Sequence, residues 1–491
     1  MKLVLKIVMV LGVVGFLAVL ECVINCSCNL VAYPASQPLK ICDNTKPADE
    51  VTEETLTEEI KQEEIPIEES QEEETFTPEE TENTEQPAKQ ITLLVYMAAD
   101  NDLETEAIRN LKEMERADFE NMNVLVLFDR SEEYDETNDN WTDTRLFELK
   151  HDSTNSANIV STRLDCAPLG LSRDSQTELD MGNQYVLKTF IEFAKENYIA
   201  DYYALIMWGH GSGWRYCNSV AFEQPVESDL SVSDKTRAVA FDDKTNTYMS
   251  IKELGAAVQR QQISVIGFDT CFGGTLETIY ELRNWTKYTV ASAGITPRAG
   301  WDYRTLLQSL STTIILTPFD IAKAMQKSSI VSTTIIDNKK IDSLNSAFED
   351  FSKALAQTIT SREVQSSILA SLLHCKSYSY NQYPCDLFLD IFSMSELFKD
   401  SQTTELSAAS NTLEQELSVA AFSSGSENPQ IAIHFIPMNS RFITQNHHNS
   451  NYLKDDSNLT QCAFIKQNSW WVPTPDGSSG SVLDNLFYVS F

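Results

Sequence analysis

The chain has 491 residues, with 37 Lys and Arg against 72 Asp and Glu and a formal net charge of −35. This charge excludes proteins that bind nucleic acid or an anionic membrane surface through a basic footprint, because phosphate recognition needs Lys and Arg. A hydrophobic content of 42% is ordinary for a globular protein, so a sizeable core is possible. The length indicates two to four domains, or one large domain with attachments.

The first residues have the pattern of an export signal. Two lysines precede an uncharged apolar run at positions 7–20, which suits a signal peptide and is short for a membrane span. Three cysteines follow at once, where bacterial lipoproteins are cleaved and acylated. The small Ser27 favours Cys28 as the acylated residue, with Cys26 and Cys22 as alternatives. Plain secretion and an uncleaved anchor both stay open.

An acidic segment follows the signal. Residues 41–90 hold 18 acidic and 3 basic side chains, a net charge of −15. The segment is rich in Glu, Thr and Pro, so it cannot bury enough apolar surface to offset the entropy lost on ordering. We therefore expect residues 1–28 to be the export segment and residues 29–90 to be a disordered tether.

Beyond the tether, apolar runs alternate with helical patterns. Continuous apolar runs predict strands at 91–97, 123–128, 202–208, 263–268 and 288–292, and an edge strand at 145–149. Apolar residues at helical spacing predict helices at 102–116, 183–197, 250–259 and 275–283. Such alternation predicts a parallel sheet with right-handed crossovers. After residue 303 the pattern predicts helices at 321–332 and 341–360 and strands at 430–436 and 486–491, which either extend the sheet or form a subdomain.

Two of the predicted strands end in residues that carry chemistry. His210 directly follows one strand and Cys271 another, so both lie at carboxyl ends of parallel strands, where active sites gather. A thiol nucleophile needs a neighbouring imidazole to take its proton. Glycines beside the histidine allow backbone amides to approach a substrate carbonyl. The spacing of these glycines is not that of a dinucleotide-binding loop.

No metal site is predicted. His447 and His448 lie in a polar stretch without a third ligand, and no DxDxDG calcium loop occurs. The cysteines after residue 42 form no CxxC pair, which argues against zinc and thioredoxin chemistry, and their disulfide pairing cannot be read from spacing. Asp100 follows a predicted strand, where capping of the loop is the simplest role.

Four stretches together resemble the clostripain family of cysteine peptidases, which share the caspase-like fold. They are residues 94–104 (LVYMAADNDLE), 200–214 (ADYYALIMWGHGSGW), 266–271 (IGFDTC) and 291–303, and weaker similarity extends the match over roughly residues 91–473. The resemblance implies an α/β/α sandwich of the caspase and gingipain type with a mainly parallel central sheet. Residues 91–305 would form the catalytic core, and residues 306–491 an α+β extension belonging to the same catalytic unit.

The resemblance also implies roles for individual residues. His210 and Cys271 would be the catalytic dyad, and the amides of Gly211 and Cys271 the oxyanion hole. Asp269 occupies the position of an acid that binds a P1 Arg or Lys, so the substrates would be proteins or peptides cleaved after basic residues. No cofactor is required by this chemistry, and calcium enters only through the resemblance.

Some residues depart from the family pattern near the expected substrate pocket. Ala293 and Gly294 stand where the family tends to carry acidic residues, and Phe272 and Gly273 replace the usual neighbours of the nucleophile. Arg298 lies nearby, and a basic residue there would oppose a P1 Arg. Specificity for basic residues is therefore less firmly indicated than the dyad.

A long polar stretch at 215–249 follows the histidine and suggests a zymogen. Long polar loops are preferred sites of nicking, and relatives of the clostripain type cleave themselves beyond their histidine. Lys235 and Arg237 lie mid-loop and are the candidate cleavage positions. The rival to the whole interpretation is a catalytically silent, peptidase-like surface lipoprotein that acts as a binding module. An intact pair of His210 and Cys271 speaks against it, because binding alone requires neither.

Overall fold

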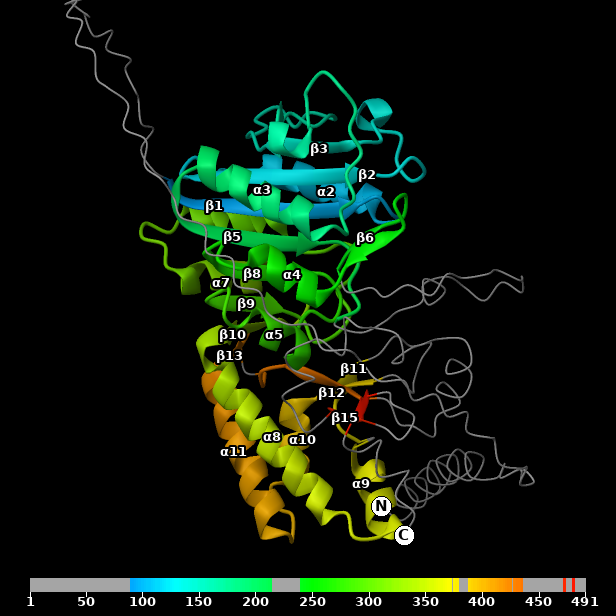
Figure 1. Ribbon diagram of the computed structural model, residues 1–491. Coiled ribbons are helices and arrows are strands. Elements are labelled where there is room, and N and C mark those ends of the chain that lie inside the picture. The colour runs from blue at the N-terminus through cyan, green and yellow to red at the C-terminus, as the bar shows by residue number, and fades with distance from the viewer. Residues whose placement is uncertain are drawn as a thin grey trace, which may run out of the picture. The chain divides into compact units, whose positions relative to one another are not determined.

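A computed structural model describes residues 89–213, 239–372, 374–378, 387–425, 427–435, 471–473 and 479–481 (Figure 1). The export signal, its three cysteines and residues 29–88 of the expected tether lie outside these residues, as do Lys235, Arg237, the two histidines at 447 and 448 and the strand expected at 486–491. The last two residues of the expected tether, Lys89 and Gln90, instead begin the first strand of the fold. From Ala88 onward the chain clusters as one compact unit. Within the described part, no helix combines the length and apolar character needed to cross a bilayer.

A large sheet forms the centre of the fold (Figure 1). Its strands are β1 (Lys89–Ala99), β2 (Met122–Arg130), β3 (Thr144–Glu148), β4 (Thr162–Leu164), β5 (Ala200–Trp208), β8 (Ile263–Asp269), β9 (Tyr288–Ala291), β10 (Thr334–Asp337) and β13 (Ala421–Ser423). They lie in the order β13-β10-β9-β8-β5-β1-β2-β3-β4. The run from β9 to β2 is parallel, and the strands outside it pair antiparallel.

Helices cover both faces of this sheet (Figure 1). One face packs against α3 (Gln184–Asn197), α4 (Ile251–Val258) and α5 (Leu276–Leu282), and the other against α2 (Glu104–Glu115), α6 (Tyr303–Ser311) and α7 (Pro318–Ser328). Along β1, Leu94 and Tyr96 enter one apolar cluster, and Leu93 and Val95 enter the other. Because successive side chains point to opposite faces, a strand buried on both sides must be apolar throughout. This is why the central strands could be predicted.

The part of the chain after α7 both extends the sheet and builds a smaller one. β10 and β13 extend the large sheet, whereas the strand predicted at 430–436 belongs to a separate antiparallel sheet in the order β11-β12-β14. The further elements are η1 (Asn138–Asn140), η2 (Ala167–Leu169), η4 (Asn338–Lys340), α8 (Ile341–Thr358), α9 (Arg362–Leu372), β11 (Ser377–Tyr378), β12 (Leu387–Asp390), α10 (Ile391–Phe398), α11 (Thr404–Ala420), β14 (Ala432–Phe435), β15 (Trp471–Pro473) and β16 (Ser479–Ser481).

The polar stretch at 215–249 is not wholly a loop. Its second part folds as a hairpin of β6 (Val239–Asp242) and β7 (Thr247–Met249), which continues directly into α4. Ser250 and Glu253 form a capping box that begins this helix. Lys244, in the turn of the hairpin, contacts Glu132 at 3.0 Å and Glu178 at 2.9 Å. The expectation of an unstructured loop is therefore wrong for residues 239–249, where buried apolar side chains of β6 fix the hairpin.

Candidate active site

Three neighbouring parallel strands end at one edge of the large sheet and deliver the polar residues of a pocket. In register, Met97 of β1 pairs with Trp208 of β5, and Trp208 pairs with Asp269 of β8. The chain therefore places His210 two positions beyond β5 and Cys271 two positions beyond β8. As expected for parallel strands, these carboxyl ends lie side by side.

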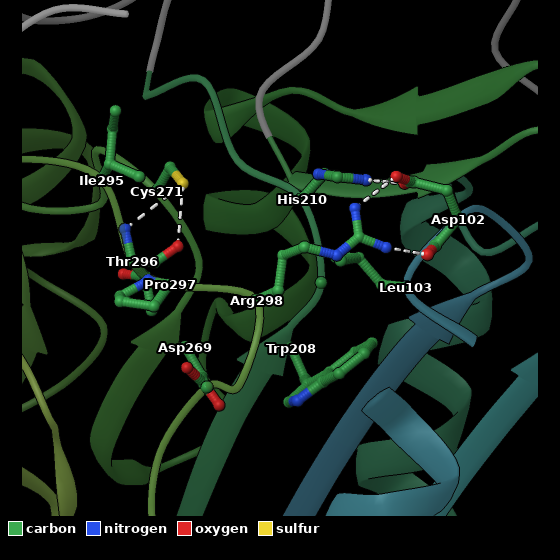
Figure 2. Close-up of a pocket in the computed structure, with 12 residues that line it drawn as sticks. Asp102, Leu103, Trp208, His210, Asp269, Cys271, Ile295, Thr296, Pro297 and Arg298 are labelled. Carbon is green, nitrogen blue, oxygen red and sulfur yellow. Dashed lines mark hydrogen bonds and ion pairs between the residues drawn. The ribbon is translucent and has the colours of Figure 1, made fainter. Parts of the chain in front are cut away.

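A pocket of about 210 Å³ opens at this edge (Figure 2). The residues predicted to carry the chemistry, His210, Cys271 and Asp269, all line it. The remaining lining residues come from the end of β1, from Trp208 and Gly209, and from the segment after β9: Asp102, Leu103, Ile295, Thr296, Pro297, Arg298 and Gly300. The segment at residues 295–300 thus forms one side of the pocket, and of its residues only Arg298 was expected near the site.

The thiol of Cys271 is held against the main chain of Thr296. The Thr296 N–H lies 3.3 Å from Sγ, and Sγ lies 3.6 Å from the Thr296 carbonyl oxygen (Figure 2). The Thr296 hydroxyl in turn donates to the carbonyl of Thr270 at 2.8 Å. The main chain of Thr296 therefore both donates to the sulfur and accepts from the thiol. Cys271 is half-buried, whereas the other free cysteines of the described residues, Cys166 and Cys375, are buried.

The turn after Cys271 is shaped by an unusual backbone conformation. Phe272 has a φ of 56°, in the left-handed region that a bulky residue seldom adopts. Its N–H donates to the carbonyl of Gly294 at 2.9 Å, and its ring stacks on Phe388 with centroids 4.8 Å apart. The replacement of the usual family residue by Phe272 is thus accommodated by packing. These contacts hold the turn after Cys271 against the segment that follows β9.

Gly211 lies against the same turn. A Cβ at this position would stand 2.5 Å from the carbonyl oxygen of Cys271 and 2.8 Å from the Cβ of Thr270, so no other residue fits. Gly211 also forms an isolated bridge with Val239, the first residue of β6. The loop that carries His210 and the turn after Cys271 are therefore in direct contact.

His210 is oriented by an acid that sequence reasoning missed. Its Nε2 lies 2.6 Å from Oδ1 of Asp102, and the imidazole lies with centroids 5.7 Å from the ring of Phe241. A carboxylate only accepts hydrogen bonds, so this contact places the proton on Nε2. In Figure 2 the other ring nitrogen points to the side of the pocket where Cys271 lies. Asp102 lies three positions beyond the end of β1, the strand next to β5, and this position is the signal that could have identified it.

Arg298 fixes Asp102 from the other side. Its guanidinium contacts Oδ2 of Asp102 at 2.6 Å and also donates to the Asp102 carbonyl. The hydrogen bonds from His210 and Arg298 hold the pKa of Asp102 well below its usual range, against the opposing effect of burial. Asp102 is therefore ionised throughout the neutral pH range. The expectation that Arg298 opposes a substrate cation overlooked this partner, because Asp102 and Arg298 are far apart in the sequence.

Asp269 forms an acidic floor beneath the dyad. It is buried, and its Oδ2 accepts hydrogen bonds from the Trp301 N–H at 3.0 Å and the Tyr303 hydroxyl at 2.9 Å. Its Oδ1 is buried without a hydrogen-bond partner. Burial raises the pKa of Asp269 to about 6, although the bonds from Trp301 and Tyr303 lower it. Gly300 keeps the space open, because a Cβ there would lie 2.7 Å from Oδ2.

If His210 is a catalytic base, as the resemblance implies, replacing Asp102 with alanine should lower kcat about tenfold to a hundredfold, because general acid–base catalysis as a whole contributes 10²–10⁴-fold and Asp102 would only position the base. The KM for a peptide should stay unchanged, and Asp102→Asn should retain part of the rate through its remaining acceptor oxygen. Steady-state kinetics of both variants checks this. An unchanged kcat in Asp102→Ala would show that the contact with His210 has no positioning role.

Arg298→Ala tests whether the positive charge beside Asp102 affects the choice of substrate. Since Arg298 is paired with Asp102, its removal should leave the ratio of activity on P1 Arg and P1 Leu substrates within about threefold of wild type. A large rise of this ratio would instead mean that Arg298 repels the P1 cation.

Known proteins share both the sequence pattern and the fold. The sequence profile of the clostripain family matches residues 95–473. Clostripain from Hathewaya histolytica is 31% identical over 201 residues, a stretch that spans 40% of this chain and 36% of that relative's length. The chain thus covers only about a third of this curated relative.

Solved structures are similar as well. An inactive zymogen C11 protease from Parabacteroides distasonis has a TM-score of 0.50 at 16% identity, covering 75% of this chain and 98% of that one. A secreted C11 cysteine protease from Bacteroides thetaiotaomicron, in complex with an irreversible peptide inhibitor, has a TM-score of 0.47 at 18% identity, covering 74% and 97%. At this identity the first likeness bears on the fold, and it confirms the expected caspase-like α/β architecture.

Proposed function

The chain belongs to the clostripain family, and on that basis we propose that it is a cysteine endopeptidase with Cys271 as nucleophile and His210 as general base and acid. The observation that carries this proposal is the convergence of Asp102, His210 and Cys271 on one pocket. They come from three adjacent strand ends, and the pocket has a buried acid at its floor. A binding module would need neither the oriented imidazole nor the half-buried thiol.

The reaction proceeds in two stages. His210 takes the proton of the Cys271 thiol, and the sulfur attacks the scissile carbonyl to form a tetrahedral intermediate. His210 then gives this proton to the leaving amine as the C–N bond breaks, which leaves a thioester on Cys271. A water molecule, deprotonated by His210, attacks the thioester and releases the new carboxylate. Asp102 holds the imidazole in one tautomer throughout. The amides of Gly211 and Cys271 are the proposed donors to the oxyanion.

The floor of the pocket supports cleavage after Arg or Lys. A cationic P1 side chain that reaches Oδ1 of Asp269 would supply the missing partner of a buried carboxylate oxygen. Charge-assisted hydrogen bonds of this kind are about twice as strong as neutral ones. The positive charge of Arg298 is offset by Asp102 and does not reduce this preference.

Hydrolysis of a fluorogenic peptidyl-arginine amide by the purified protein tests the activity directly. The rate should disappear after treatment with iodoacetamide, and an unreactive peptide of the same length serves as the control for binding. A protein that binds the peptide but does not hydrolyse it, with an accessible Cys271, would instead be the silent surface module.

Self-activation is a further part of the proposal. Residues 214–238 are flanked by Gly213 and Val239. The bridge between Gly211 and Val239 brings these two flanking positions close to His210. Lys235 and Arg237 lie between them and match the proposed specificity. Lys244 is a poorer candidate, because two carboxylates hold it in the hairpin turn.

Purified wild-type protein should therefore split into two fragments whose boundary follows Lys235 or Arg237. Cys271→Ala should stay a single chain, and so should a variant in which both basic residues are changed to glutamine. Mass spectrometry of the intact chains gives the boundary. Wild type that stays one chain and is fully active would contradict the zymogen proposal.

The N-terminal sequence supports export, with acylation of Cys28 preferred over Cys26 and Cys22. Metabolic labelling with palmitate in the native host should mark the protein, and Cys28→Ser should lose the label. Persistent labelling in Cys28→Ser would move the site to one of the other two cysteines. An unlabelled wild-type protein in the medium would favour plain secretion.

A further inference from the structure

The smaller sheet carries a row of rings beside the turn that follows Cys271. Tyr378 of β11, Phe388 of β12 and His434 of β14 lie opposite one another in the register of this antiparallel sheet. Directly opposite residues of antiparallel strands have their side chains on the same face, so the three rings share one face. The rings of Phe388 and His434 have centroids 5.1 Å apart. We call these three residues the ring row.

The ring row packs against a strained residue. Phe272 has a φ of 56°, in the left-handed region, which is unfavourable for a bulky side chain. Its ring stacks on that of Phe388, with centroids 4.8 Å apart and planes inclined by 25°. Such a conformation persists only where the surrounding structure fixes it, and it occurs most often at functional sites. The stack is one such constraint, because the Phe272 ring would lose it if the backbone relaxed.

A second constraint on the same residue passes through Gly294. The carbonyl of Gly294 accepts the N–H of Phe272 at 2.9 Å. A Cβ at Gly294 would lie 2.9 Å from Cδ1 of Tyr378, so the ring of Tyr378 lies directly on this backbone. The Tyr378 hydroxyl donates to Oδ2 of the buried Asp390 at 3.0 Å, which fixes the ring. The lack of a side chain at Gly294, a departure from the family pattern, is therefore what allows Tyr378 to lie there.

The conformation of Phe272 affects the relative position of Cys271 and His210. Its φ sets the direction of the peptide group between Cys271 and Phe272, and the carbonyl of this group belongs to Cys271. A Cβ at Gly211 would stand 2.5 Å from that carbonyl oxygen, so the oxygen lies against the loop that carries His210. A relaxation of Phe272 to negative φ would turn this carbonyl and change the contact. The nucleophile and its base thus share one backbone conformation.

We propose that Tyr378 and Phe388 are positioning residues, which hold Phe272 in the left-handed conformation and thereby place the Cys271 thiol for attack. This inference rests on the proposed peptidase function and extends it to the smaller sheet, whose strands lie between residues 377 and 435. Neither side chain is among the residues that line the pocket, so their effect should appear in kcat and not in KM.

Kinetics of paired variants at positions 272 and 388 tests the proposal. Phe388→Leu should lower kcat about tenfold to a hundredfold and leave KM within about threefold, because a misplacement of about 1 Å can cost 10²-fold in rate. Glycine adopts the left-handed conformation without steric cost. In a Phe272→Gly background, Phe388→Leu should therefore cost less than about threefold, since the two positions are coupled. Phe272→Leu, which keeps the strain and loses the stack, should lose more of its kcat than Phe272→Gly.

Hydrogen exchange gives a readout that needs no peptidase activity. In a Cys271→Ala background, which also prevents self-cleavage, Phe388→Leu should speed exchange of the Phe272 amide at least about tenfold, because its bond to Gly294 then opens more often. Mass spectrometry with residue-level fragmentation measures this. Phe351→Leu is the matched control, because Phe351 is also a buried, stacked ring but belongs to α8. It should change neither kcat nor this exchange rate.

An unchanged kcat or an unchanged exchange rate in Phe388→Leu would each overturn the proposal. So would an equal loss of kcat in the wild-type and Phe272→Gly backgrounds, because the ring of Phe388 would then act only through general stability. If Phe388→Leu does not fold, equal kcat values for Phe272→Leu and Phe272→Gly would overturn it. A wild-type protein without peptidase activity would refute the proposed function, and the exchange rates would still decide whether the ring row holds the turn.

Discussion

Cys271→Ala should reduce peptide hydrolysis about 10⁴- to 10⁶-fold, which is the loss seen when a covalent nucleophile is removed from a peptidase. No other described thiol can replace it. Cys166 and Cys375 are buried, and burial raises the pKa of both, that of Cys375 to about 11, so they remain unreactive thiols. His210→Ala should be nearly as severe, since the thiol then lacks a base and the leaving amine lacks an acid.

The two losses should not add. In the proposed mechanism Cys271 and His210 act as a unit, so the double variant should be no slower than the worse single variant within about tenfold. Initial rates on a peptidyl-arginine substrate measure all three, and Cys166→Ala is the matched control that should keep its activity. Substantial hydrolysis by Cys271→Ala would remove the basis of the proposed mechanism.

The second large effect is expected at Asp269. Asp269→Asn should lower kcat/KM for P1 Arg and Lys about 10²- to 10³-fold, because truncating one partner of a buried charge pair costs about 2–5 kcal/mol. A P1 Leu substrate should change far less. The asparagine keeps an acceptor for Trp301 and Tyr303, so the pocket should stay intact. A library that shows acidic or hydrophobic P1 preference in the wild type would contradict the assignment.

The raised pKa of Asp269 gives this prediction a pH signature. Since the pKa is about 6, the carboxylate becomes protonated below pH 6 and its charge is lost. The ratio of kcat/KM for P1 Arg over P1 Leu should then fall by up to tenfold per pH unit, and it should be flat in Asp269→Asn. Using a ratio removes the titration of the dyad, which both substrates share.

The same group affects stability with a definite sign. Its folded pKa lies above the ordinary value of 3.8, so ionisation is disfavoured in the folded state and stability falls as the pH rises through 4 to 6. The difference of roughly two pKa units corresponds to about 3 kcal/mol. Asp269→Asn should therefore unfold no lower than wild type at pH 7.5, which shows by thermal melting that its lost activity is not lost fold.

The sequence predicted those parts of the fold that are buried on both sides. Helices cover both faces of the sheet, so β1, β2, β5 and β8 contain continuous apolar runs. These runs allowed the strands and their ends to be predicted. His210 and Cys271 follow from those ends. The short outer strands β4, β10 and β13 carry no such signal, and the β6–β7 hairpin was hidden in a polar stretch.

Long-range pairing was not readable from one sequence. Asp102 and Arg298 form an ion pair although they lie 196 positions apart in the sequence. Both belong to stretches that resemble the family, but nothing in the sequence indicates that they are in contact. Asp100 was interpreted as a capping residue, whereas its carboxylate lies with Asp129 and Asp242. In each case the contact depends on which strands are neighbours in the sheet. Hydrophobic periodicity predicts where the strands are in the sequence, but it does not predict their order in the sheet.

Covalent labelling with a peptidyl acyloxymethyl ketone tests the central claim most directly. One experiment identifies the nucleophilic residue and measures the P1 preference that is attributed to Asp269. The reagent with P1 Arg should form one adduct, located on Cys271 by peptide mapping, much faster than the reagents with P1 Asp or P1 Leu. Asp269→Asn should abolish this difference, and His210→Ala should slow all three reagents. An adduct on another cysteine, or equal rates for P1 Arg and P1 Asp, would contradict the account.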